Sequence, residues 1–319
     1  MKFIFKIQEP ATFFYFLDSV SLWDIHTRKW IREYYENKFS ITKQDKKFIK
    51  KYIKIRKKYP WGILDSDFIL AKNFDEVNKN LNKRLTKNEY VCVMEIINYF
   101  YPNIHKIYIE WKNRLEKRKN NLEKLSKKIK TEKIFSEIIK FYKSKHYPVV
   151  VYVHLLINPS ESQSGGGANI NPRKHITIET SKLDKETTEN VKNSLSVIIH
   201  ETLHLIESGI EKKEWKNFEK RVKKQKLNFN ILTEAIADTL VPHGYLAQKY
   251  KLNKKTVFQY KELKIPNKKN KSEYYQKTRQ KLSALIYPLT EKQMRGGKSV
   301  FDDDYIEKCI FEFKKMLKK

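Results

Sequence analysis

Apolar residues in the first part of the chain recur at three- and four-residue spacing. Aromatic and aliphatic side chains follow this spacing over residues 13–30 and again over residues 49–55. Such a period places the apolar side chains on one face of an amphipathic helix. Pro60 and Gly62 interrupt the pattern, because Pro and Gly together mark a turn. We therefore expect residues 1–145 to form a helical, Lys-rich region.

The pattern changes after residue 146. Residues 149–157 form a short apolar run rich in β-branched side chains, which is typical of a buried strand. Residues 160–171 contain three consecutive glycines and indicate a loop. Residues 175–179 alternate apolar and polar side chains, as a half-exposed strand does. This part of the chain therefore predicts a small β-sheet.

Two helices are expected next. Residues 184–209 are polar at first and apolar on several sides later, with Gly209 as the expected C-cap. A second helix begins near Ile231, and Pro242 should kink or end it. The chain from there to Lys319 also has a helical pattern. The predicted fold class is α+β, mostly α, with one domain over residues 1–145 and another over residues 146–319.

Composition limits the kind of protein this can be. Hydrophobic residues make up 40% of the 319 residues, which excludes a wholly disordered chain although the formal charge is +30. That charge suggests a nucleic-acid or anionic-membrane partner, but only 10 of the 67 basic residues are Arg. Arg is the better bidentate ligand for bases and phosphates. The Lys excess, together with abundant Ile, Asn and Tyr, fits an AT-rich genome better than selection for a polyanion.

Cysteine usage and apolar runs bear on the compartment. Cys92 and Cys309 are far apart, so no disulfide framework or metal-ligand spacing is indicated. The longest apolar runs are much shorter than the roughly 18 to 20 residues that span a bilayer. Lys6, Glu9 and Pro10 interrupt the segment that a signal peptide would need to be apolar. We therefore expect a cytoplasmic protein without a membrane partner.

One motif carries candidate chemistry. The buried helix contains His200-Glu201-Thr202-Leu203-His204. Residues four apart lie on the same helix face, so both imidazoles can bind one ion while Glu201 reaches beside it. Zinc hydrolases need this combination of two nitrogen ligands and a carboxylate next to the open position of the metal. A buried helix seldom carries such polar groups without a partner for them.

A catalytic zinc normally has three protein ligands, and Glu234 on the next helix is the candidate for the third. Ala235 and Ala237 are small, so this helix can approach the first one closely. Asp238, one turn beyond Glu234, can accept the spare N–H of a ligand imidazole and so orient its ring. Other carboxylates lie between the two motifs and remain alternatives as ligands: Glu207, Glu211, Glu214 and Glu219.

With these two motifs the sequence resembles the gluzincin metallopeptidases, the thermolysin-like group. The resemblance covers residues 149–245 and implies a zincin-like domain with one zinc ion per chain. It implies that His200, His204 and Glu234 bind the zinc. It also implies that Glu201 is the general base and that Asp238 supports the site. Residues 1–145 resemble no family that we can name.

Peptide hydrolysis also requires groups that hold the substrate. The resemblance suggests a Tyr or His at the rim of the site, for which His243 and Tyr245 are the first candidates and Tyr287 the next. Glycines allow close approach of a substrate backbone along residues 165–179 by β-augmentation. The residues expected to contact the substrate there are Gly166, Gly167 and Asn169.

The sequence thus predicts a zinc-dependent peptidase that acts on a peptide or protein substrate. Two other classes stay open: a catalytically inactive zincin-fold interaction protein, and a Lys-rich nucleic-acid binder with a structural metal site. The most basic segment, residues 112–133, fits a solvated helix face better than a nucleic-acid-binding helix. The sequence does not indicate the substrate or the oligomeric state.

Overall fold

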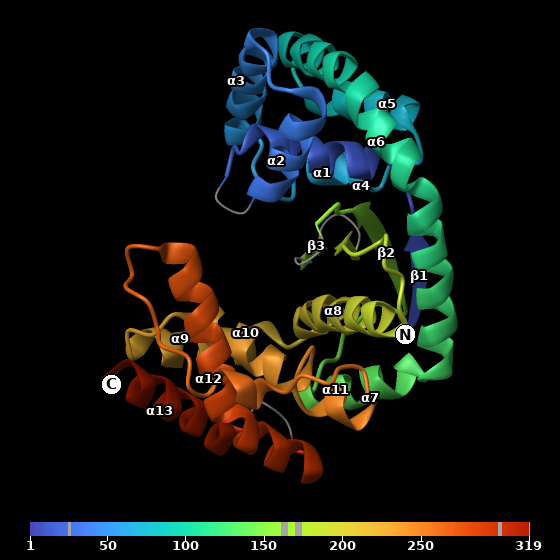
Figure 1. Ribbon diagram of the computed structural model, residues 1–319. Helices are drawn as coiled ribbons and strands as arrows, with labels where there is room; N and C mark the ends of the chain where they lie inside the picture. The colour runs from blue at the N-terminus through green and yellow to red at the C-terminus, as the bar shows by residue number, and fades with distance from the viewer. Residues whose placement is uncertain (25–26, 161–164, 170–173, 299–301, 319) are drawn as a thin grey trace. The chain divides into compact units, whose positions relative to one another are not determined.

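The computed structural model describes residues 1–24, 27–160, 165–169, 174–298 and 302–318. They form mostly helices and a small four-stranded sheet with strand order β1-β2-β4-β3 (Figure 1). The predicted architecture, mostly α with a small sheet, is confirmed. The strands are β1 (Lys2–Lys6), β2 (Val150–Ile157), β3 (Gly165–Asn169) and β4 (His175–Thr180). The helices are α1 (Glu9–Ser21), α2 (Lys29–Phe39), α3 (Lys43–Lys58), α4 (Asp65–Ile69), α5 (Phe74–Arg84), α6 (Lys87–Lys128), α7 (Thr131–Tyr142), α8 (Thr188–Glu207), α9 (Lys212–Lys224), α10 (Phe229–Leu240), α11 (Tyr245–Lys249), the 3₁₀-helix η1 (Val257–Tyr260), α12 (Lys271–Arg295) and α13 (Asp303–Lys318).

The sheet contains both expected strands and two that the sequence pattern did not indicate. β2 pairs in parallel with β4, and β3 pairs with β4 in antiparallel orientation. β3 lies within the expected loop. Its glycines have low strand propensity, so this segment is a strand because it pairs with β4. β1 lies within the expected helical region, where the Lys2 amide donates to the carbonyl of Val149 at 2.8 Å. β4 is more buried than expected, because it is an inner strand of the sheet.

Contacts divide the chain into two compact units, and their boundaries differ from the expected division after residue 145. The N-terminal unit comprises residues 4–123 and 152–190, and the C-terminal unit comprises residues 1–3, 124–151 and 191–319. The segment 152–190 belongs with the N-terminal helices because ion pairs connect it to them. Arg118 on α6 is 1% exposed, and its Nε lies 2.6 Å from Oε2 of Glu186. Nε of Arg28 lies 2.7 Å from Oε1 of Glu179.

Aromatic side chains fill the core of the N-terminal unit, as the helical spacing predicted. Phe13 and Phe16 on α1 are buried together with Phe68 on α4 and Phe100 on α6. The rings of Phe13 and Phe68 are stacked, with their centroids 6.4 Å apart. A capping box of Thr42 and Asp45 starts the neighbouring helix α3.

The C-terminal unit is built around α8, α10 and α12. Its core contains aliphatic side chains from all three helices, including Leu203, Ile236 and Leu282. Asn228 caps the start of α10 by accepting from the Ile231 amide, so the helix begins slightly before the expected residue. α10 and α12 lie side by side (Figure 1). This packing brings residues of α12 next to the motif on α10.

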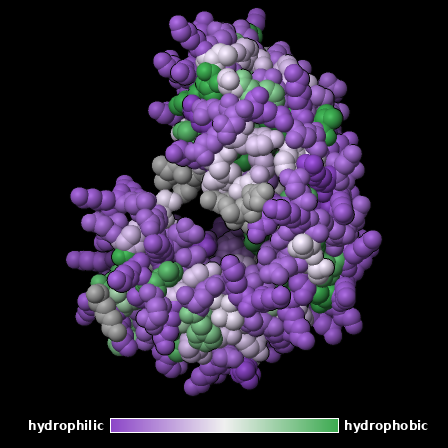
Figure 2. All heavy atoms as spheres, viewed as in Figure 1, coloured by the Kyte–Doolittle hydropathy of each residue, from purple (hydrophilic) through white to green (hydrophobic). Residues whose placement is uncertain are grey.

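The face seen in Figure 2 is mostly polar, with apolar residues in small groups. Among the described residues, none of the helices combines the length and the hydropathy that crossing a membrane requires.

Candidate metal centre

Two histidines stand one turn apart on α8. This helix is buried by apolar residues on several sides, and His200 is 7% exposed. Because the two positions are four apart, both rings lie on one face of the helix. The rings are nearly perpendicular, at 88°, and their Nε2 atoms are 3.3 Å apart. Two nitrogen ligands are thus directed at one point.

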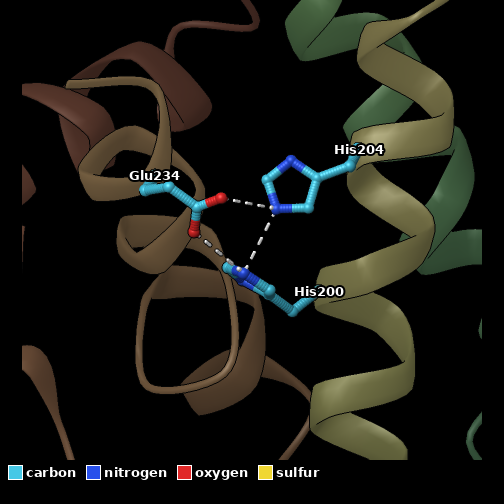
Figure 3. Close-up of side chains that lie close together, drawn as sticks. All are labelled: His200, His204 and Glu234. Atoms are coloured by element: carbon cyan, nitrogen blue, oxygen red, sulfur yellow. Dashed lines mark hydrogen bonds and ion pairs between the residues drawn. The ribbon is translucent and has the colours of Figure 1, made fainter. Parts of the chain in front are cut away.

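Glu234 on α10 faces both rings (Figure 3). Its Oε1 lies 3.2 Å from Nε2 of His204, and its Oε2 lies 3.5 Å from Nε2 of His200. One ligand atom from each of the three residues lies within 4.8 Å of the other two. Two imidazole nitrogens and a carboxylate oxygen form a donor set that suits zinc, so these residues fit a metal site. The structure contains no ion and does not identify the metal.

The charges around the rings favour a cation. Apart from Glu234, three carboxylates interact with the two histidines, and the guanidinium of Arg279 acts on Glu234 and Asp238. Burial lowers the pKa of His204, but the charges of Glu207 and Glu234 outweigh it and raise the pKa to about 10. With neutral imidazoles the cluster therefore has an excess of negative charge, which a proton or a metal ion can balance. The carboxylates that act on the histidines are Glu201, Glu207, Glu234 and Asp238.

A hydrogen bond at Nδ1 orients each ring. Nδ1 of His200 lies 3.0 Å from the carbonyl oxygen of Val241, and Nδ1 of His204 lies 2.8 Å from Oε2 of Glu207. Partners at Nδ1 leave both Nε2 atoms free to bind a metal. The sequence argument weighed Glu207 only as a competing ligand. Its spacing of three from His204 on the same helix was the signal for this supporting role.

Asp238 does not make the hydrogen bond that was expected of it. Its Oδ1 lies 3.8 Å from Nδ1 of His200, whose hydrogen bond goes to the backbone instead. Asp238 forms an ion pair with Arg279, with Nε and Oδ2 2.9 Å apart. Arg279 also donates from Nη1 to Oε2 of Glu234 at 2.9 Å. No spacing in the sequence pointed to Arg279, because α12 meets α10 only through tertiary packing.

Glu201 follows His200 directly on α8 and is partly buried. Burial raises the pKa of its carboxyl, although the charges of the two histidines oppose this. Within the described part of the chain, Glu201 has no hydrogen bond or ion pair. A carboxylate without such a partner beside a metal site can accept a proton from a bound water molecule.

The rim candidates differ in their surroundings. Burial and the nearby charges of Lys255 and His200 lower the pKa of His243 to about 4, so this ring is neutral at pH 7. Tyr245 starts α11, where its ring lies 5.9 Å from Nζ of Lys249. Tyr287 packs against Phe258 on η1.

A further tyrosine, which sequence reasoning missed, is affected by the charges of the acidic cluster. Tyr275 stands on α12 one turn before Arg279. Burial and the charge of Glu234 raise the pKa of its hydroxyl to about 12. This hydroxyl donates a long hydrogen bond, of 3.4 Å, to the carbonyl oxygen of Asn230. By exchanging this bond, Tyr275 can donate to a substrate, and it joins His243 as a candidate donor.

The expected substrate-binding residues belong to the N-terminal unit. Gly166, Gly167 and Asn169 lie on β3. The alternative ligands Glu211, Glu214 and Glu219 are not part of the cluster that could hold a metal.

Searches against family models, curated proteins and solved structures find no match for this chain.

Proposed function

We propose that the chain is a zinc-dependent peptidase with a zincin-like C-terminal unit. The observation that carries this proposal is the convergence of His200, His204 and Glu234 from two helices, with Glu201 beside them. The resemblance of the two motifs to gluzincin metallopeptidases supports the same reaction. The substrate would be a peptide or protein. The cytoplasmic location stays a prediction.

In this proposal His200, His204 and Glu234 would hold the zinc ion. The ion would supply Lewis acidity, lowering the pKa of a water molecule and polarising the scissile carbonyl. The Glu201 carboxylate takes the proton from that water and later passes it to the leaving amine. A neutral His243 or the Tyr275 hydroxyl would donate a hydrogen bond to the developing oxyanion. Tyr245 is the less suitable donor, because its ring lies against Lys249.

One observation favours a non-catalytic centre. Arg279 already donates to Oε2 of Glu234, so the carboxylate has a partner even without a metal. A cluster of this kind can stabilise the packing of α10 on α12 and have no catalytic role. The two functions differ in what they require of Glu201, whose carboxylate has no hydrogen bond or ion pair among the described residues.

The test compares Glu201→Gln with the wild type. Zinc content and cleavage of a quenched fluorescent peptide library should be measured on the same preparations. We expect about one zinc per chain in both proteins and a loss of cleavage of at least about 100-fold in the variant, because only the base is removed. His200→Ala should lose both zinc and cleavage.

The matched control is Glu214→Gln on α9, an exposed site that should retain zinc and activity. Cleavage by Glu201→Gln at the rate of the wild type would exclude Glu201 as the base. A zinc-loaded wild type that cleaves no peptide would support the non-catalytic centre. The absence of zinc from the wild type would overturn the peptidase proposal and leave a metal-free cluster held together by Arg279.

A further inference from the structure

A cavity of about 580 Å³ lies within the N-terminal unit. All of its described lining residues belong to this unit, and none of them is part of the candidate metal centre. The volume is in the range of pockets that bind small organic molecules.

One face of the sheet forms a wall of the cavity. His175, Thr177 and Glu179 alternate along β4 and therefore point to the same side. Leu156 of β2 is paired with Glu179 and completes this wall. Gly167 on β3 also lines the cavity, and its small size leaves room there. The wall thus presents the apolar side chain of Leu156 beside the acidic side chain of Glu179.

Glu179 offers an unused hydrogen-bond acceptor in this cavity. The residue is 7% exposed, and its Oε1 accepts from Nε of Arg28 at 2.7 Å. Its Oε2 is buried and has no hydrogen-bond partner among the described residues. The hydroxyl of Tyr15 lines the same cavity beside this carboxylate, and burial and the charge of Glu179 raise its pKa, but no described residue lies within hydrogen-bonding geometry of it. Leaving a buried charged acceptor unpaired is costly, so a bound donor would be favourable.

The described lining of the cavity is acidic, although the chain as a whole is basic. Three carboxylates belong to this lining, and two arginines form ion pairs with them. Arg28 pairs with Glu179, while the fully buried Arg56 pairs with the other two. Burial raises the pKa of Asp18 to about 7, so the negative charge of the described lining at neutral pH comes mainly from Asp65 and Glu179. The lining carboxylates are Asp18, Asp65 and Glu179.

Aromatic rings provide a surface for an apolar group beside these charges. Phe14 and Tyr15 on α1 line the cavity, as does Trp61 in the turn before α4. Aromatic faces also attract organic cations. We propose that the cavity binds a small organic amine, whose ammonium group donates to Oε2 of Glu179 and whose apolar body packs against these rings.

The test uses two probes of the same shape, phenethylamine and phenethyl alcohol. Their affinities for the full chain should be measured at pH 7 by titration followed by NMR. We expect the amine to bind at least about tenfold more tightly, because only the ammonium makes a charge-assisted hydrogen bond with a buried carboxylate. Glu179→Gln should remove this preference, whereas Glu33→Gln, at an exposed site on α2, should keep it.

A second variant tests the location of the site. A Cβ at Gly167 would have its nearest neighbour, Oγ1 of Thr177, at an ordinary 3.5 Å, so the strand can accept a side chain there. Gly167→Val should fill part of the cavity and weaken binding of the amine at least about tenfold. Equal affinities of the two probes for the wild type, or no binding of the amine, would overturn the proposal. So would unchanged amine binding in folded Glu179→Gln or in Gly167→Val.

Discussion

The atoms that orient the two imidazoles come from different kinds of group. His200 is oriented by the backbone carbonyl of Val241, and His204 by the side chain of Glu207. A backbone partner cannot be removed by mutation, but the Glu207 carboxylate can. The two rings therefore differ in how sensitive they are to substitution of their neighbours.

A prediction at the residue scale concerns the rank of the carboxylates. Glu234→Ala should nearly abolish zinc binding, because it removes a direct ligand. Glu207→Ala should weaken zinc binding by about 10- to 100-fold, because it removes only the group that orients His204. Glu207→Gln should have a smaller effect, because its amide oxygen can still accept from Nδ1. Competition with a chromophoric chelator measures these affinities.

Asp238→Ala provides the comparison. We expect its zinc affinity to lie between those of Glu234→Ala and the wild type. Asp238 acts on the site through its ion pair with Arg279 and through its own charge. Zinc binding by Glu207→Ala equal to that of the wild type would show that His204 does not need this partner. Full zinc binding by Glu234→Ala would exclude Glu234 as a ligand.

His154 on β2 predicts a pH dependence of stability. The ring is 3% exposed, and neither nitrogen has a hydrogen-bond partner among the described residues. Burial, with a smaller contribution from the charges of His175 and Lys6, lowers its pKa to about 3. Below the unfolded pKa of about 6.5, the unfolded chain therefore binds more protons at this site than the folded protein. Acidification from pH 6.5 towards 3 favours unfolding.

The measurement is urea unfolding at several pH values. Between pH 6 and 4, the free energy of unfolding of the wild type should fall by about 1.4 kcal/mol per pH unit more than that of His154→Leu. His146→Leu, at an exposed position, should keep the slope of the wild type. Equal slopes for the wild type and His154→Leu would contradict the prediction.

At the scale of the elements, the end of α8 depends on one close approach. Gly209 follows the helix, and its carbonyl accepts from the amides of Lys145 and His146. A Cβ at Gly209 would lie 1.7 Å from the carbonyl oxygen of His146. Since backbone atoms cannot yield as a flexible side chain does, only glycine fits at this position. The expected C-cap glycine is thus needed for packing against the chain that precedes β2.

Gly209→Ala should therefore lower the free energy of unfolding by about 1–3 kcal/mol. Gly296→Ala is the control, because its nearest neighbour, the Lys292 carbonyl oxygen, would be 3.3 Å away. This change should cost at most about 0.5 kcal/mol. Chemical denaturation measures the free energy of unfolding of both variants. Equal values for Gly209→Ala and Gly296→Ala would show that the backbone near residue 209 moves to accept the Cβ.

The elements also differ in how well the sequence indicated them. β2 was predictable because β-branched residues dominate a short apolar run between prolines. β3 was not, since a run of glycines favours a loop and becomes a strand only by pairing with β4. Helix α10 was predictable from its apolar pattern and from the proline that follows it.

At the scale of the whole molecule, the chain crosses between its two units more than once. The candidate metal centre belongs to the C-terminal unit, and the cavity with Glu179 belongs to the N-terminal unit. The boundaries of these units do not follow the order of the sequence, and ion pairs such as Arg118 with Glu186 join segments that are distant in the chain. These pairs leave no periodic pattern in the sequence.

The sequence by itself determined the features that depend on local spacing. The four-residue interval between His200 and His204 places both rings on one helix face wherever that helix packs. Glu201 follows His200 directly, so its position beside this face is also fixed by the sequence. The two motifs together indicated that Glu234 pairs with these residues. Only the tertiary structure decided what surrounds them. Arg279 comes from α12 through the packing of α12 on α10, and β3 exists through its pairing with β4, because both depend on contacts between segments that no local pattern encodes.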